Sequence, residues 1–350
     1  MFAKPLLVLG LSLGLLAAPR PAAASQAASQ AASPTQPELA KQSEDNAPVA
    51  DKHWKREVRR AVDEEQFARL DQIASALRTG KSRLQGGGWR LQDFYSIVDS
   101  IGDDDAAALA RIALLHRWME ARPGSITPRV ALGGVLHRWA WRARGGGTAD
   151  KVTNDGWRLF HERLAQAAQD LTEAQKLPET CPHLYFEWLT VGLGQDWEPE
   201  KMRGMFEQAV KAEPGYVLYY QLYANYLQPK WDGQPGEASA FAKSAADRLG
   251  GADGDVIYFQ IALILIHRGN PGLSAKEMDW ARIQRGYFAT RERYGVTEHQ
   301  ENLMAYMAWK FRDAAFAQKQ FEKIGEKWSK KVWHDQATFD KARQWTEAHS

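Results

Sequence analysis

The sequence contains a single cysteine, which excludes disulfide bonds as a source of stability. Cys181 is the only cysteine among 350 residues, so no disulfide can form within one chain. The folded state must therefore depend on its apolar core. We expect Cys181 to be buried and unreactive, because a reactive thiol needs an exposed site that stabilises its thiolate.

The chain also lacks an excess of charge of either sign. It has 45 Lys and Arg against 43 Asp and Glu, and residues 1–24 contain Lys4 and Arg20 but no acid. If these residues are removed, basic and acidic side chains balance. Nucleic-acid-binding domains usually carry a basic surplus or a basic stripe, so the composition argues against a nucleic-acid partner.

Long apolar runs are confined to the N-terminus. Residues 6–18 are apolar except for Gly and Ser, follow Lys4 and precede the small residues Ala22–Ala24. The run is shorter than the roughly 20 residues that a transmembrane helix needs, and the pattern is typical of an export signal that is removed on maturation. We therefore predict a signal peptide at residues 1–24, a periplasmic or secreted protein, and no integral membrane span after cleavage.

The next segment, residues 25–52, lacks aromatic residues and is rich in Ser, Gln, Ala and Pro. Such a segment buries too little apolar surface to offset the entropy that is lost on ordering. We predict a disordered tether at residues 25–52 and an α-helical repeat domain at residues 53–350.

Motifs for catalysis, cofactors and metals are missing from the sequence. There is no phosphate-binding loop, no dinucleotide-binding glycine pattern after a strand, no nucleophile elbow and no HExxH. The nine histidines are scattered, and Cys181 with His183 forms a two-ligand pair at best, whereas a metal site needs several converging ligands. We interpret Gly86–Gly88 and Gly145–Gly147 as helix breaks, because glycine adopts the left-handed backbone that helix ends need. We predict no catalytic residues, no cofactor and no metal.

Helical signals are present almost throughout the chain from Trp54. Residues 56–78 place apolar side chains close to helical spacing. Asp103–Asp105 and Thr127-Pro128 are typical of helix N-termini, and Ser274–Glu277 and Thr297–Gln300 each fit a capping box. No alternating strand pattern stands out, so we predict an all-α fold.

Small and large residues recur at the spacing of a helical repeat. In QENLMAYMAWKFRDAAFAQKQFEKI, Ala305, Ala317 and Phe321 occupy the two small positions and the aromatic position of a tetratricopeptide repeat. In MFEQAVKAEPGYVLYYQLYANYL, Phe206 and Ala209 fit the end of one such repeat. The chain thus resembles a degenerate tetratricopeptide array, which implies a right-handed solenoid of antiparallel helical hairpins.

A second resemblance is carried by five segments that occur in order along the chain. They read FARLDQIASALRTGKSRLQGGGWRLQDFY, PRVALGGVLHRWAWRARGGG, GWRLFHERLAQAAQDL, YANYLQPKWDG and MDWARIQRGYF. Together they resemble a bacterial domain-of-unknown-function family, the one numbered four-zero-three-four, over nearly all of the chain after the tether. The resemblance implies a helical-repeat architecture and brings no activity with it.

Tryptophan is plentiful, with 14 residues, and most of these rings should fill gaps between helices. Trp139 and Trp141 stand apart, because residues two positions apart on a helix point to different faces. At least one of them must contact another layer, a loop or a ligand. Arg142 and Arg144 follow, and they either cap the helix C-terminus and stack on the tryptophans or bind a carboxylate of a ligand.

The segment YLQPKWDG interrupts the helical pattern after a tyrosine-rich helix. Pro229 cannot continue that helix, so a constrained turn presents Lys230 and Trp231. Trp231 either folds back as a plug over the end of the helical hairpin or forms the rim of a binding surface. The candidate binding surface also includes Tyr219, Tyr220 and Tyr223 of the preceding helix. Together with Tyr226 they cover more than one face of that helix, so some of the four must leave the core.

Two functions fit these features. The first is a non-enzymatic scaffold of the cell envelope that binds a protein or peptide on the surface of a helical solenoid. The alternative is a glycan-binding or glycan-hydrolysing envelope protein with an aromatic-lined groove. Hydrolysis would require two carboxylates about 5–10 Å apart across that groove. The absence of such a pair would exclude a hydrolase.

Overall fold

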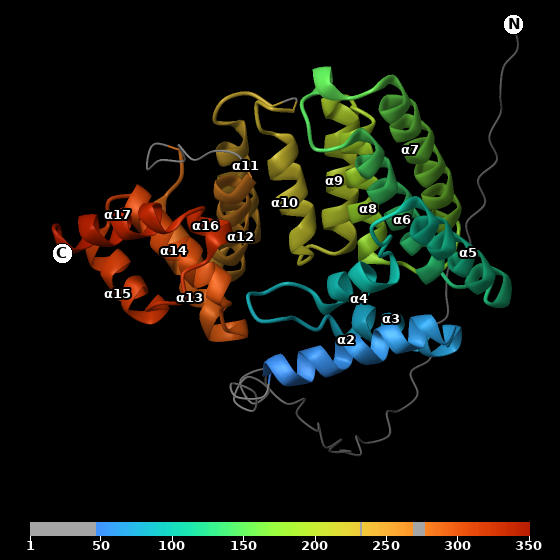
Figure 1. Cartoon of the computed structure of the whole chain (residues 1–350), viewed down its shortest axis with the longest axis horizontal. Coiled ribbons are helices and arrows are strands. Elements are labelled where there is room, and N and C mark those ends of the chain that lie inside the picture. Colours follow the sequence, from blue (N-terminus) through green and yellow to red (C-terminus); the bar gives the residue numbers. More distant parts are fainter. Residues whose placement is uncertain (1–46, 232, 269–276) are drawn as a thin grey trace, which may run out of the picture.

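The computed structural model describes residues 47–231, 233–268 and 277–350, and its regular structure there is helical (Figure 1). The predicted all-α class is therefore confirmed. The only strand-like feature in these ranges is an isolated antiparallel bridge between Arg83 and Trp89. None of the helices described is both long enough and apolar enough to cross a membrane. The predicted signal peptide lies outside the described residues, as does most of the predicted tether.

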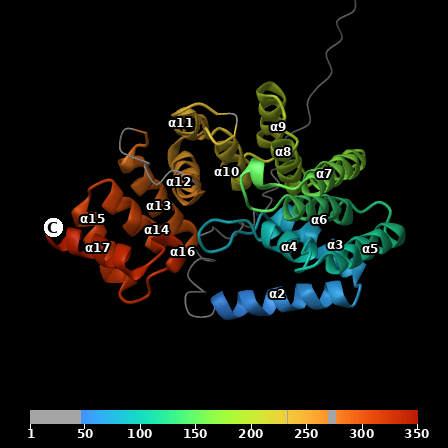
Figure 2. The ribbon, with the colours of Figure 1, turned by 45° about the horizontal axis from the view of Figure 1, so that its top comes forward.

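From Ala47 to Ala212 the structure has eight α-helices and a short 3-10 helix. Helix α2 runs along one side of the molecule beneath α3 and α4, while α5 to α9 form the end of the molecule nearest α2's C-terminus (Figures 1 and 2). The helices are α2 (Ala47–Asp63), α3 (Phe67–Gly80), α4 (Arg90–Val98), α5 (Asp105–Ala121), α6 (Thr127–Arg144), η1 (Ala149–Lys151), α7 (Asn154–Gln175), α8 (Pro182–Gly194) and α9 (Pro199–Ala212).

The second half continues the array to the opposite end of the molecule. Successive helices pack on one another as hairpins, for example α11 on α12, α12 on α13 and α14 on α15. The helices are α10 (Val217–Tyr226), α11 (Glu237–Leu249), α12 (Gly251–Arg268), α13 (Trp280–Tyr294), α14 (Glu298–Lys310), α15 (Ala314–Ile324), α16 (Lys330–Trp333) and α17 (Gln336–Glu347).

The small and aromatic positions of the repeat pattern lie inside the helix pairs. Ala305 on α14 and Ala317 on α15 are fully buried, and Phe321 is almost so. Phe206 and Ala209 of α9 are buried in the same way. An all-helical array of hairpins is thus established, while the tetratricopeptide likeness and the right-handed winding stay predictions.

The first helices differ from their expected bounds. Helix α2 begins at Ala47, before the boundary predicted at His53, so the end of the predicted tether is helical. The apolar pattern at residues 56–78 is also divided between two helices. Glu65 has φ of 51°, and Gln66 N–H donates to the carbonyl of Ala61 at 2.9 Å, which is the six-to-one bond of a Schellman ending.

Several predicted helix starts are confirmed. The side chain of Asp104 caps α5 by accepting from Ala107 N at 2.7 Å. Thr297 and Gln300 form the predicted capping box of α14, in which each side chain accepts from the other residue's backbone N–H. At α6 the start is one residue earlier than expected, so Thr127 is itself helical. Of the box predicted at Ser274–Glu277, residues 274–276 lie outside the described residues, and α13 begins only at Trp280.

The loop Lys81–Trp89, which we call the bridging loop, reaches from the first half to the second (Figure 2). The carbonyl of Gly86 accepts from the side chains of Gln260 on α12 at 2.8 Å and Gln300 on α14 at 3.0 Å. Gly86 N–H donates to the carbonyl of Gly295 at 3.1 Å. The glycine triplet was predicted to break a helix; it lies in the loop between α3 and α4 and also makes a contact between distant parts of the chain.

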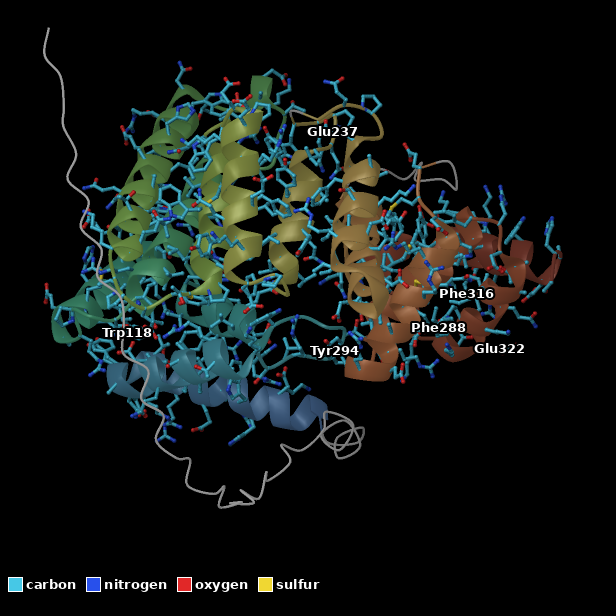
Figure 3. The ribbon with its side chains drawn as sticks, turned by 180° about the vertical axis from the view of Figure 1, so that it is seen from behind. Trp118, Glu237, Phe288, Tyr294, Phe316 and Glu322 are labelled. Atoms are coloured by element: carbon cyan, nitrogen blue, oxygen red, sulfur yellow. The ribbon has the colours of Figure 1, made fainter. Side chains whose placement is uncertain are left out.

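The base of the bridging loop is fixed to the α9–α10 turn. Arg83 stacks on Trp89 with its guanidinium carbon 4.2 Å from the ring centroid. Both side chains donate to the carbonyl of Gly215, at 3.0 and 2.9 Å. Lys81 forms an ion pair with Glu213 at 2.7 Å. Tyr294, which stands beside the loop in Figure 3, packs against its tip at Gly87.

Candidate functional site

The two tryptophans near the end of α6 face different neighbours, as their spacing predicted. Trp139 is half-buried, donates its indole N–H to Asp105 at 2.6 Å, and lies 3.5 Å beneath the guanidinium of Arg163. Arg142 donates to the same carboxylate at 2.7 Å. These hydrogen bonds, from Trp139 first and then Arg142, lower the pKa of Asp105. Trp139 and Arg142 therefore join the end of α6 to the start of α5.

Trp141 belongs to a different group, which we call the aromatic cluster: Trp141, Arg144, Trp157 and Trp231. Trp141 and Trp231 meet edge to face, with ring centroids 6.0 Å apart. The guanidinium of Arg144 lies 5.5 Å from the Trp141 ring and 5.4 Å from the Trp157 ring. Arg144 also donates to the carbonyls of Gly145 and Gly147 just beyond α6, so it both stacks on tryptophan and holds the glycine segment that follows the helix.

The turn after α10 holds Trp231 against this cluster. Trp231 N–H donates to the carbonyl of Gln228 at 2.9 Å, and the Trp231 ring is half-buried, with its Nε1 atom buried and without a partner. Lys230 is exposed. A Cβ atom on Gly233 would lie 1.9 Å from the carbonyl oxygen of Leu227, so only glycine fits there. Trp231 thus plugs the hairpin end and still offers part of its ring to the surface. Its neighbour at position 232 lies outside the described residues.

The tyrosines of α10 are all buried, so our expectation that some of them leave the core is wrong. Tyr219, Tyr220, Tyr223 and Tyr226 are at most 6% exposed. Helix α10 is surrounded, because α8, α9, α11 and α12 all pack against it. The hydroxyls of Tyr219 and Tyr220 donate to main-chain carbonyls at 2.6 and 2.9 Å, which satisfies their polar ends inside the core. These rings therefore offer no exposed binding surface.

A pocket of about 310 Å³ opens beside the same turn, between the ends of α10, α11 and α12. Its walls combine apolar side chains with side-chain amides and one residue of each charge. The lining residues are Leu227, Gln228, Pro229, Lys230, Gln234, Pro235, Gly236, Ala238, Ser239, Leu265 and Glu277.

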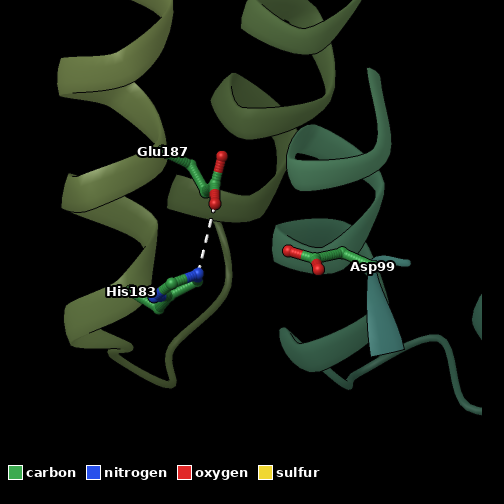
Figure 4. Close-up of side chains that lie close together, drawn as sticks. All are labelled: Asp99, His183 and Glu187. Carbon is green, nitrogen blue, oxygen red and sulfur yellow. Dashed lines mark ion pairs between the residues drawn. The ribbon is translucent and has the colours of Figure 1, made fainter. Parts of the chain in front are cut away.

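A second polar site lies inside the molecule, where α4 meets α8. Asp99 ends α4, and His183 and Glu187 stand one turn apart on α8; all three are almost completely buried. One metal-ligating atom of each lies within 4.8 Å of the other two. Figure 4 shows the three side chains converging on one space, with the ion pair between His183 Nε2 and Glu187 Oε1 at 3.1 Å. We predicted no metal site from the sequence, and this grouping was not anticipated.

Charged and polar neighbours hold these side chains in place. Arg138 donates to Asp99 Oδ2 at 3.0 Å, and His137 Nδ1 lies 2.5 Å from Glu187 Oε2. Burial opposes ionisation of Glu187, but the two histidines outweigh it and lower the pKa of that carboxyl. For Asp99, burial has the larger effect and raises the pKa, although Arg138 opposes it.

The single cysteine lies next to this site. Cys181 is fully buried, as predicted, and its sulfur is 3.2 Å from the hydroxyl of Tyr95. Burial raises the pKa of the thiol. Tyr95 in turn stacks on the ring of His183, with centroids 4.3 Å apart.

Comparison with known protein families identifies the first part of this structure. Residues 55–178 match the family described as Domain of unknown function (DUF4034). The resemblance drawn from the sequence is thereby confirmed for this region, while the segments YANYLQPKWDG and MDWARIQRGYF lie beyond the match. Searches of curated proteins and of solved structures gave no match to the chain.

Both sites combine the DUF4034 region with helices that follow it. Asp99 and Trp141 lie inside the matched residues, whereas His183, Glu187 and Trp231 lie outside them. One local signal for the buried site exists in the sequence, since His183 and Glu187 are four residues apart and share a helix face. Asp99 carries no comparable signal, because only the packing of α4 against its neighbours brings it to α8.

Proposed function

We propose that the protein is an exported, non-enzymatic scaffold of the cell envelope that binds a polypeptide at the turn between α10 and α11. The observation that carries this proposal is the pocket beside the turn, close in sequence to the partly buried ring of Trp231. We call Pro229, Lys230, Trp231 and the pocket lining the turn face. Export is supported by the N-terminal sequence pattern alone.

The chemistry of the turn face suits an extended peptide. Leu227, Pro229, Pro235 and Leu265 supply apolar walls for side chains of a partner. Gln234 is exposed on the pocket rim, and its amide can pair with a peptide backbone, which carries one donor and one acceptor at nearly every residue. Rigid aromatic rings such as Trp231 lose little entropy on binding and are common anchors of protein interfaces.

Two described residues of the turn are closely packed, which favours binding. Gly233 lies against the Leu227 carbonyl with no room for a side chain, and the Trp231 ring is held by Trp141. A surface that is already ordered loses less conformational entropy when a partner arrives. We therefore infer that the turn face binds without rearrangement.

Glycan hydrolysis is the less favoured alternative. Among the described residues that line the pocket, Glu277 is the only carboxylate, whereas hydrolysis needs a facing pair. No specific contact favours a sugar over a peptide, so we retain the polypeptide.

The test is selection of peptides on the purified full chain. A phage-displayed library of random 16-residue peptides is selected against the immobilised protein, and the dissociation constants of enriched peptides are measured by fluorescence anisotropy. Trp231→Ala should weaken binding by about 30-fold or more, which is the size of effect expected for an aromatic anchor.

The control is another partly exposed aromatic residue. Phe288 on α13 is 50% exposed and lies near Phe316 at the other end of the molecule (Figure 3). Phe288→Ala should leave peptide affinity unchanged. Failure to enrich any peptide, or equal loss of affinity in the two variants, would contradict the proposed turn face.

A further inference from the structure

The buried site at α4 and α8 contains polar atoms that have no hydrogen-bond partner. Asp99 Oδ1 is shielded from solvent and has no partner in the described structure. His183 Nε2 and Glu187 Oε1 are equally shielded and face each other as an ion pair at 3.1 Å, without forming a hydrogen bond. Buried polar groups are nearly always paired, and unpaired ones call for an explanation such as a bound ion. Here the atoms without a hydrogen bond belong to three side chains that converge.

Each of these side chains is oriented through its other polar atom. Asp99 accepts from Arg138 through Oδ2, Glu187 contacts His137 through Oε2, and His183 contacts the Tyr216 hydroxyl through Nδ1 at 2.7 Å. One atom of each side chain is thus fixed by the protein, and the other is directed toward the shared space. Such outer hydrogen bonds are the usual support of metal ligands, particularly for histidine.

We propose that Asp99, His183 and Glu187 bind one divalent first-row transition-metal ion. His183 Nε2 supplies a nitrogen ligand, and the two carboxylates supply oxygen, a donor set that suits Zn²⁺ and Mn²⁺. Ligand bonds of about 2.0–2.2 Å in tetrahedral geometry place two ligand atoms roughly 3.3–3.6 Å apart. The three ligand atoms lie within 4.8 Å of one another, so binding an ion requires side-chain movements of about 1 Å.

The charges around the site favour a dication. Asp99 and Glu187 bring two carboxylates, and Arg138 is the only Arg or Lys side chain paired with either of them among the described residues. A divalent cation between the two carboxylates would compensate their charge, so that neither of them stays buried without a partner. The backbone also leaves space for Asp99, since a Cβ atom on Gly134 would lie 2.5 Å from Asp99 Oδ2.

The ion would join the DUF4034 region to the helix that follows it. Asp99 lies within the matched residues and the other two ligands lie on α8. Because the unfolded chain does not hold these ligands together, binding should stabilise the folded state. The proposal is independent of the turn face and stands whether or not a peptide binds there.

The experiment uses the full chain without a histidine tag. The protein is stripped with a chelator, dialysed, and titrated with Zn²⁺ at neutral pH, with bound metal measured by mass spectrometry and stability measured as the thermal midpoint. We expect one equivalent of Zn²⁺ and a rise in the midpoint. The proposal would be overturned if neither this titration nor a parallel titration with Mn²⁺ showed stoichiometric binding.

Variants of similar shape locate the ion. Glu187→Gln and His183→Gln should weaken Zn²⁺ binding by at least 100-fold, and His137→Gln, which alters only an outer contact, by about 10- to 100-fold. The matched controls are His116→Gln and Glu322→Gln at exposed positions, the latter labelled in Figure 3. Both controls should bind Zn²⁺ as tightly as the unaltered chain does. If the ligand variants also bound Zn²⁺ as tightly as the unaltered chain, the proposed site would be wrong.

If the ligand variants do not fold, crystals of the unaltered chain with Zn²⁺ decide the question. An anomalous difference peak at the zinc edge between Asp99, His183 and Glu187 would support the site. A peak confined to other residues, or no ordered peak, would overturn it.

Discussion

Individual glycines show how much a residue's role depends on contacts far along the chain. Gly86 and Gly87 have φ of 86° and 85°, as expected of residues where the chain turns sharply. Their sequence context suggested a helix break and nothing more. What the sequence does not reveal is that Gly86 lies against Gln300 and that Gly87 lies against Gln260 and Tyr294, because those contacts exist only once the second half has folded.

The first and last glycines of this triplet, Gly86 and Gly88, should differ in how much stability is lost when each is replaced by alanine. Gly86→Ala places a Cβ atom 2.6 Å from Gln300 Oε1 and forces a left-handed alanine, so we expect a loss of roughly 2–4 kcal/mol in the free energy of unfolding. Gly88 has an ordinary φ and open space around it. Gly88→Ala should therefore be neutral or stabilising by up to about 1 kcal/mol. Urea unfolding of the two variants measures both changes in stability. Equal changes would show that the bridging loop does not pack against the second half of the chain.

Aromatic residues were easier to interpret from the sequence. Trp118 and Trp188 are buried, and Trp157 and Trp309 are partly buried against the core, as helical spacing predicted. The tyrosines of α10 were misjudged because periodicity assumes that one face of a helix is exposed. That helix is enclosed on several sides, and a buried tyrosine needs only one hydrogen bond for its hydroxyl.

At the scale of helices, starts were predicted better than interruptions. Asp104 and Thr297 cap their helices through local hydrogen bonds, and local chemistry can be read from neighbouring residues. The break between α2 and α3 was missed because Glu65 takes a left-handed backbone, which glycine or asparagine normally marks. Tertiary packing of two short helices outweighs the local preference of this residue.

The capping box of α14 offers a test at this scale. Thr297→Ala removes one cap and should cost about 1 kcal/mol of stability. Gln300→Ala should cost about 2 kcal/mol, because Gln300 completes the box and also donates to Gly86 in the bridging loop. Thermal and urea unfolding measure both effects. A smaller cost for Gln300→Ala than for Thr297→Ala would contradict the second role of this side chain.

At the scale of the molecule, segments distant in sequence meet at each feature of interest. The bridging loop joins α3 and α4 to α12 and α14, and the buried site joins the end of α4 to α8. The all-α class followed from composition and periodicity, because those depend on neighbouring residues. The meeting of Asp99 with Glu187, or of Trp141 with Trp231, depends on helix packing, and a single sequence carries no direct record of it.

The central claim is that the turn face binds a polypeptide, and site-specific photo-crosslinking in cells tests it most directly. A photoreactive phenylalanine analogue replaces Lys230 in one full-length variant and Phe288 in another, and covalent adducts are detected after illumination. The account predicts a discrete protein adduct at position 230 and none at position 288. No adduct at position 230, or the same adduct at both positions, would contradict it.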